Sequence, residues 1–128
     1  HVAYPGGGHD ADTMAAMADT NMLTGRTVQL ARQPILPFER PYDIPILFDL
    51  DSGTSLAVAK AHIDDVVANG KLCVVYGHQI QAAAGATAWA ESDFIELCNY
   101  IAQKRMINLT IEDAYQLQSG SRTVRRAG

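Results

Sequence analysis

The sequence has little cysteine, no long hydrophobic run and no excess of positive charge. Its 128 residues include two cysteines and one tryptophan, and the formal net charge is −4. A membrane-spanning helix needs about 20 consecutive apolar residues, so we expect no membrane span. Nucleic-acid-binding domains carry a basic surface, so we do not expect nucleic acid as a partner either.

The two cysteines are expected to be free. Cys73 lies in an apolar run typical of a strand, and Cys98 lies in a segment typical of a helix. The sequence has no Cys-x-x-Cys pair, which zinc-binding modules use, and no Gly-x-Ser-x-Gly, the nucleophile turn of many serine hydrolases. We therefore predict two buried free thiols rather than a disulfide or a metal pair.

What is present suits one domain or a piece of one. Hydrophobic residues make up 48% of the chain, enough for a core. We place the domain at residues 1–118 and a basic, flexible tail at residues 119–128, with a phosphate or partner contact of that tail as the alternative. The chain opens on a strand-like run without a methionine, which favours a trimmed, processed or partial chain.

Short apolar runs predict the strands. Prolines predict an irregular connection over residues 31–43, and residues 79–90 are expected to form a loop of small residues around Trp89. One of the expected strands is interrupted by Gly25. The strands are expected at residues 2–4, 22–28, 46–48, 72–76 and 108–109.

Apolar residues at helical spacing predict four helices between these strands. Side chains that can accept a backbone N–H stand at each start, glycine or asparagine ends two of them, and the last helix has a capping-box pattern. The helices are expected at residues 11–20, 55–69, 93–105 and 111–117. Their caps are expected to be Asp10, Thr54, Ser92 and Thr110 with Asp113, and their ends Asn21 and Gly70. The inward residues of the second and third helices are expected to be Leu56, Ala59, Ile63, Val66 and Val67, and Phe94, Leu97, Cys98 and Ile101.

Strands alternating with helices predict an α/β fold with parallel strands and right-handed crossovers. Sites in such folds form at the carboxyl ends of the strands. Three polar groups occupy such positions here: the turn at residues 5–10, the pair Asp49 and Asp51, and His78. We therefore expect a site there, although each group alone also has a structural explanation as a turn, a cap or a hydrogen-bonded strand end.

Other polar and aromatic residues are weaker candidates. His9, Asp10 and Asp12 resemble a metal cluster, but Asp10 is better explained as a helix cap and Asp12 as an acid favoured by the helix dipole. His62 is expected to be a surface residue. Trp89 can either line a sugar-binding groove or pack its loop against the core.

Three short motifs, in this order and spacing, resemble the polysaccharide deacetylases of the carbohydrate esterase class. They are Ala3-Tyr4-Pro5-Gly6-Gly7 before a helix, Phe48-Asp49-Leu50-Asp51-Ser52-Gly53-Thr54-Ser55, and Val74-Val75-Tyr76-Gly77-His78. The resemblance implies that residues 1–118 form the C-terminal part of a (β/α) barrel. It implies metal-dependent removal of N- or O-acetyl groups from a glycan.

The resemblance also implies roles for individual residues. Gly6 would donate its N–H to the oxyanion, Asp51 matches the first acidic residue of the family's fourth motif, and His78 would protonate the leaving group. The substrate-binding residues would be Tyr4, Pro5, Val74, Tyr76 and Trp89. Three positions depart from the family pattern: Ala3 replaces an arginine, Thr54 an aspartate and Ser55 a tryptophan.

No metal ligands are expected within this chain. The resemblance implies a divalent, zinc-like ion whose ligands lie in a missing N-terminal half or a partner chain. The expected substrate is an acetylated polysaccharide, and the expected location is extracellular, at the cell surface or on a virion. The alternative is a non-catalytic glycan-binding or structural module, for example in a surface or phage-tail assembly.

Overall fold

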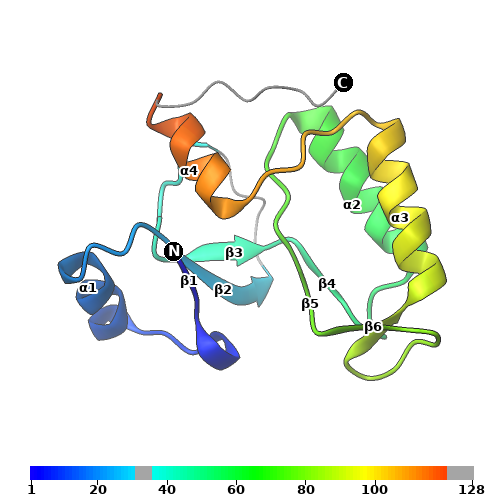
Figure 1. Ribbon diagram of the computed structural model, residues 1–128, viewed down its shortest axis with the longest axis horizontal. Helices are drawn as coiled ribbons and strands as arrows, with labels where there is room; N and C mark the ends of the chain where they lie inside the picture. The colour runs from blue at the N-terminus through cyan, green and yellow to red at the C-terminus, as the bar shows by residue number, and fades with distance from the viewer. Residues whose placement is uncertain (31–35, 121–128) are drawn as a thin grey trace.

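The described residues combine α-helices with short strands that pair in parallel (Figure 1), which confirms the expected α/β class. The computed structural model describes residues 1–30 and 36–120, so the predictions for residues 31–35 and for most of the basic tail lie outside the described residues. The elements in chain order are β1 (Val2–Ala3), the 3₁₀ helix η1 (Pro5–Gly7), α1 (Ala11–Asp19), β2 (Gly25–Leu30), β3 (Ile44–Ile46), β4 (Phe48–Leu50), α2 (Leu56–Asn69), β5 (Val75–Gly77), β6 (Gln79–Gln81), β7 (Ala88–Ala90), α3 (Glu91–Gln103) and α4 (Ile111–Gln118).

The strands pair in parallel and in sequence order. The pairings are β1 with β2, β2 with β3, β4 with β5, and β6 with β7. Only Leu47 separates β3 from β4, and only His78 separates β5 from β6, so two bent stretches link the three small sheets. The N–H of Leu47 donates to the Val74 carbonyl at 2.8 Å across one of these bends. The described residues do not form a closed barrel.

Several strand predictions were wrong in position. The segment expected to be a loop after His78 contains both β6 and β7, and the described residues have no strand at 108–109. Gly25 does not interrupt a strand but begins β2. Its missing side chain makes room for Tyr4, because a Cβ at residue 25 would lie 2.3 Å from the Tyr4 hydroxyl.

The helix ends follow local chemistry, with two errors. Asp10 accepts the Thr13 N–H at the start of α1, and Gly70 ends α2 at φ 61°. Thr110 and Asp113 form the expected capping box of α4. The predicted caps of the two middle helices are wrong: Ser55 caps α2 in place of its neighbour Thr54, and α3 begins at Glu91 after Ala90, without a side-chain cap and ahead of the expected Ser92.

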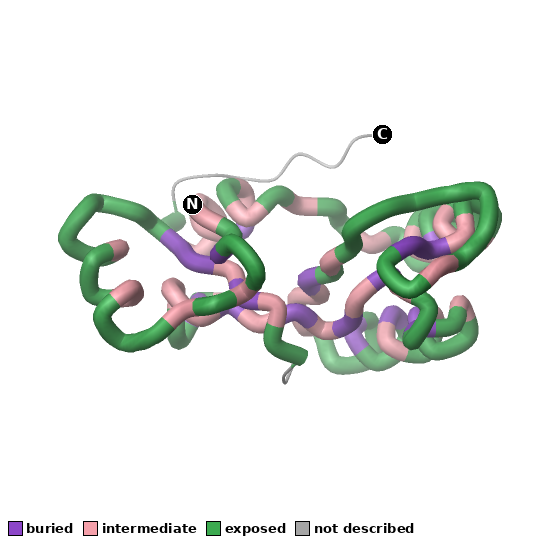
Figure 2. The backbone as a smooth tube through the Cα atoms, turned by 90° about the horizontal axis from the view of Figure 1, so that it is seen from below, coloured by how far each residue is buried: buried purple, intermediate pink, exposed green. Residues whose placement is uncertain are grey.

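Two hydrophobic clusters make the core. The first packs β4 and β7 against α2 and α3, which lie side by side in Figure 1. It contains Phe48, Leu50, Ala59, Ile63, Trp89 and Leu97. The second packs β3 against α4 and contains Phe38, Ile44, Ile46, Val74 and Ala114. Figure 2 shows the buried segments running along the strands through the middle of the molecule.

Some residues expected to face inward do not. Cys98 and Val67 are exposed, because each follows a buried helix residue directly and so points about 100° away from it. His62, expected at the surface, is half-buried and stacks on Phe48 with the ring centroids 5.3 Å apart.

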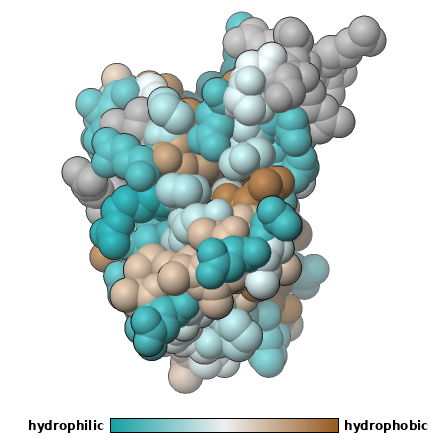
Figure 3. Space-filling model, turned by 90° about the vertical axis from the view of Figure 1, so that its left-hand side faces the viewer, coloured by the Kyte–Doolittle hydropathy of each residue, from teal (hydrophilic) through white to brown (hydrophobic). Residues whose placement is uncertain are grey.

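Helix α1 stands apart from the core. None of its residues is buried. Figure 3, which faces the side of the molecule where α1 lies, shows pale tan and teal atoms intermixed and only small brown areas. This helix therefore adds little hydrophobic stabilisation to the described structure.

No helix in residues 1–30 or 36–120 is both long enough and apolar enough to cross a membrane.

Candidate functional site

The carboxyl ends of β4 and β5 bring two of the predicted residues to one edge. The last paired residues of these strands are Leu50 and Gly77. Asp51 and His78 are the next residue on each strand, so their backbones leave the sheet at the same level. The parallel register, rather than any contact between the two side chains, places them there.

The imidazole of His78 is exposed and held by Tyr76. The Tyr76 hydroxyl lies 2.8 Å from Nε2 and 3.2 Å from Nδ1 of His78. The two rings meet edge to face, with centroids 4.8 Å apart. A histidine held by a phenol and open to solvent can give or take a proton at a bound molecule. Tyr76, which the resemblance implies to be a substrate-binding residue, is here the residue that orients His78.

The carboxylates at the end of β4 are turned toward their own loop. Asp51 Oδ1 accepts the Gly53 N–H at 2.7 Å, and the Asp51 carbonyl accepts the Thr54 N–H at 3.2 Å. Asp49 Oδ1 accepts from the Thr54 hydroxyl at 3.3 Å. These contacts are those of a turn that leads into α2. The role predicted for Asp51 is therefore not visible as a contact with His78.

The glycine turn after β1 exposes a backbone donor. Gly6 and Gly7 have φ values of 62° and 75°, a conformation that side chains other than glycine rarely adopt. The Gly7 N–H donates to the Tyr4 carbonyl at 2.9 Å, whereas within the described residues the N–H of exposed Gly6 has no such partner. Pro5 is also exposed. The N–H of Gly6 therefore remains able to donate a hydrogen bond to an oxyanion.

Tyr4 lies beneath this turn and is 5% exposed. Its hydroxyl donates to the Tyr42 carbonyl at 2.8 Å. Burial, with a smaller contribution from the Asp43 carboxylate, raises the pKa of Tyr4 above its ordinary value. Tyr4 therefore remains a neutral phenol that anchors the turn.

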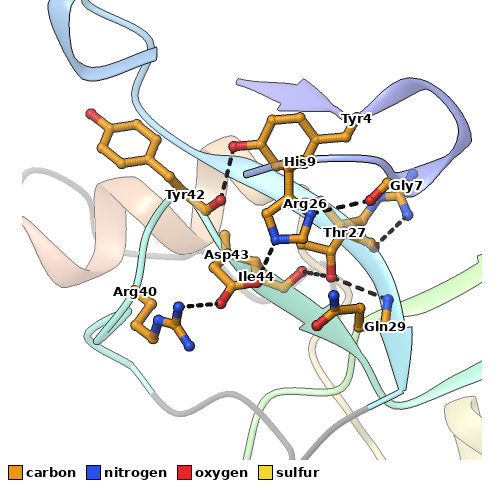
Figure 4. Close-up of polar contacts among 10 residues, drawn as sticks. All are labelled: Tyr4, Gly7, His9, Arg26, Thr27, Gln29, Arg40, Tyr42, Asp43 and Ile44. Atoms are coloured by element: carbon orange, nitrogen blue, oxygen red, sulfur yellow. Dashed lines mark hydrogen bonds and ion pairs between the residues drawn. The ribbon is translucent and has the colours of Figure 1, made fainter. Parts of the chain in front are cut away.

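His9 fixes the turn from its other end, a role that no local sequence pattern indicates. Its Nε2 lies 3.1 Å from Asp43 Oδ1 and its Nδ1 lies 3.1 Å from the Gly7 carbonyl oxygen (Figure 4). The imidazole also stacks on Tyr4, with centroids 5.0 Å apart and an angle of 11° between the rings. Asp43 is 34 residues away in the chain, so only the fold brings this pair together.

The other two predicted substrate-binding residues lie in the core. Trp89 is 2% exposed, and its indole N–H donates to the Thr54 carbonyl at 2.7 Å. Val74 is 8% exposed and packs in the second cluster. For Trp89 this arrangement matches the packing alternative, because the ring is covered by protein.

Arg26 is a site residue that the sequence reasoning missed. It pairs in register with Ala3, the position where the family resemblance leads us to expect an arginine. Its guanidinium carbon lies 5.0 Å from the centroid of the Tyr76 ring, and one N–H donates to the Thr27 carbonyl at 3.0 Å. Strand β2, which pairs with β1 and β3, therefore supplies the Arg26 cation that lies beside Tyr76 and His78.

Within residues 1–30 and 36–120, no three histidine, cysteine, aspartate or glutamate side chains gather so that they could hold a metal ion. Asp10, one of the residues that resembled a metal cluster, accepts from both the N–H and the hydroxyl of Thr13. Those hydrogen bonds lower the pKa of the Asp10 carboxyl, as expected for a helix cap.

Comparison with known proteins does not identify a family for this chain. No family model matches the chain, and neither does a curated protein or a solved structure. The functional argument therefore rests on the residues and contacts described above.

Proposed function

We propose that this chain contributes the general acid of a glycan deacetylase, with His78 as that acid. The observation that carries the proposal is the exposed imidazole at the end of β5, held by Tyr76 at 2.8 Å. The sequential parallel order of the strands supports it, since this is the strand order of a (β/α) barrel. In that fold the carboxyl ends of the strands surround the active site.

The chemistry follows from the two exposed groups. Water attacks the acetyl carbonyl and gives its proton to a carboxylate, which the resemblance places in another segment or in a partner chain, and the N–H of Gly6 donates to the carbonyl oxygen as it becomes negative. His78 then gives its proton to the departing amine or alkoxide, which releases acetate. The Tyr76 hydroxyl keeps the imidazole ring in the orientation that this transfer needs.

The divalent, zinc-like ion expected from the resemblance does not fit the described residues alone. Its ligands would come from another segment or from a partner chain, and we derive no step through it. The proposed substrate is an acetylated polysaccharide. The protein itself would be located outside the cell, on the cell surface or on a virion.

Acetate release by the protein isolated with any chain that accompanies it tests this proposal. Replacing His78 with alanine should lower the rate of acetate release by about 10²–10⁴-fold, the usual contribution of a positioned acid or base. His62→Gln is the matched control, since this histidine stacks on Phe48 and should change the rate little. Equal rates for His78→Ala and the wild type would refute the role of His78.

The second candidate is a glycan-binding or structural module without catalysis. The contacts of Asp51, which are those of a turn and do not include His78, favour it. A wild-type protein that binds acetylated glycan but releases no acetate in the presence of zinc would decide for this candidate.

A further inference from the structure

Arg26 carries a charge that the described structure does not neutralise. Its contacts are the Thr27 carbonyl and the face of the Tyr76 ring, and no carboxylate in the described residues pairs with it. The guanidinium group has five N–H donors, so most of them remain available. An arginine that is only half-exposed gains from a partner that uses these donors.

The acidic side chains of the adjoining strands and loops do not take this role. Asp43, next to the residue that pairs in register with Arg26, contacts His9 and Arg40. Asp49, which pairs in register with Tyr76, accepts from the Thr54 hydroxyl. Asp51 accepts from the Gly53 N–H. Both carboxylates are thus engaged with their own loop, and Arg26 stays free for an external anion.

The arginine also lies close to the proposed acid. The Tyr76 ring contacts both, with the Arg26 guanidinium carbon 5.0 Å from its centroid and the His78 ring 4.8 Å from the same point. A sugar-sized molecule that contacts His78 can therefore also reach the planar guanidinium group of Arg26. The planar guanidinium group matches a carboxylate, which can accept two parallel N–H bonds.

We propose that Arg26 binds the carboxylate of an acidic sugar residue next to the sugar presented to His78. The substrate would then be an acetylated glycan that contains uronic acid or another carboxylated sugar. The identity of the sugar as a substrate rests on the proposed function, whereas binding of the carboxylate by Arg26 does not.

Calorimetric titration with methyl glucuronide, methyl glucoside and inorganic phosphate tests this inference. The wild type should bind the glucuronide at least about 10-fold more tightly than the neutral glucoside, because hydrogen bonds to charged groups are the stronger kind. Arg26→Gln should abolish this preference, and Arg26→Lys should keep only part of it, since lysine offers a point charge without the planar pair of donors. Arg105→Gln, which removes a charge from the exposed segment after α3, should behave as the wild type.

Three results would overturn the inference. The first is equal affinity for glucuronide and glucoside. The second is a preference for glucuronide over glucoside that survives in Arg26→Gln, when circular dichroism shows that this variant is folded. The third is phosphate binding as tight as that of the glucuronide. The last result would identify a site for any small anion. A charge preference without acetate release would leave the Arg26 site standing and reject the deacetylase, and acetate release without a charge preference would do the opposite.

Discussion

Replacing His9 with phenylalanine should destabilise the fold by about 2–4 kcal/mol. The substitution keeps an aromatic ring that can stack on Tyr4, and it removes both hydrogen bonds of the imidazole. A hydrogen bond to a charged group contributes about 1.5–3 kcal/mol and a neutral one about 1 kcal/mol. The side chains of His9 and Asp43 are only 8% and 13% exposed, so water replaces little of this loss.

Urea denaturation followed by circular dichroism measures the effect. With a slope of about 2 kcal/mol/M, in the middle of the range for small proteins, the midpoint should fall by roughly 1–2 M. Arg40→Gln is the control, because Arg40 also pairs with Asp43, at 2.8 Å, but is 67% exposed. That exposed ion pair should be worth less than about 1 kcal/mol. A loss below about 0.5 kcal/mol for His9→Phe, the size of an ordinary surface substitution, would show that His9 does not fix the turn in solution.

Three further predictions follow from other contacts. Burial raises the pKa of Cys73 to about 12, so a thiol reagent at pH 8 should modify Cys98, which is exposed, and should reach Cys73 only after unfolding; rapid modification of both thiols in the native protein would contradict this. Gly25→Ala should cost about 1–3 kcal/mol in the free energy of unfolding, because the new methyl group overlaps the tyrosine hydroxyl beneath the turn; an unchanged denaturation midpoint would refute that packing. The hydrogen bonds from Lys104 and, to a smaller extent, from Tyr100 lower the pKa of Asp64. Lys104→Ala should therefore raise the pKa of Asp64 toward its ordinary value in an NMR titration. The ion pair of Asp64 with Lys104 should stabilise the fold at pH values above the pKa of Asp64 in the unfolded chain, and this stabilisation should disappear as the pH falls through the pKa of Asp64 in the folded protein.

Features with a local cause could be predicted from the sequence. The caps at Asp10 and at Thr110 with Asp113 satisfy backbone N–H groups within the same turn. Gly70 adopts the left-handed conformation that glycine tolerates best. The α/β class followed from the alternation of such local signals. The expected barrel did not follow in the same way, because closure depends on strands at the two ends of the sheet.

Features that depend on distant residues could not be predicted. Gly25 resembles a strand breaker until the Tyr4 ring is seen to occupy the space beside it. The small residues after His78 lack the apolar pattern of strands, yet β6 and β7 pair there in parallel. In the candidate site the strand ends placed His78 and Asp51 as expected. Its ordering contacts, from Arg26 to Tyr76 and from His9 to Asp43, span segments that no sequence pattern connects.

The order of the strand pairs also determines when each contact can form while the chain is being synthesised. Each strand pairs with the strand that precedes or follows it in chain order, so the sheets can assemble progressively from the N-terminal end as the chain leaves the ribosome. The exception is α4, whose Gln118 side chain accepts the Phe38 N–H at 2.7 Å across 80 residues. The second cluster therefore stays open to solvent until the last helix emerges, and a ribosome stalled before residue 111 should carry a nascent chain whose first three strands are accessible to chaperones.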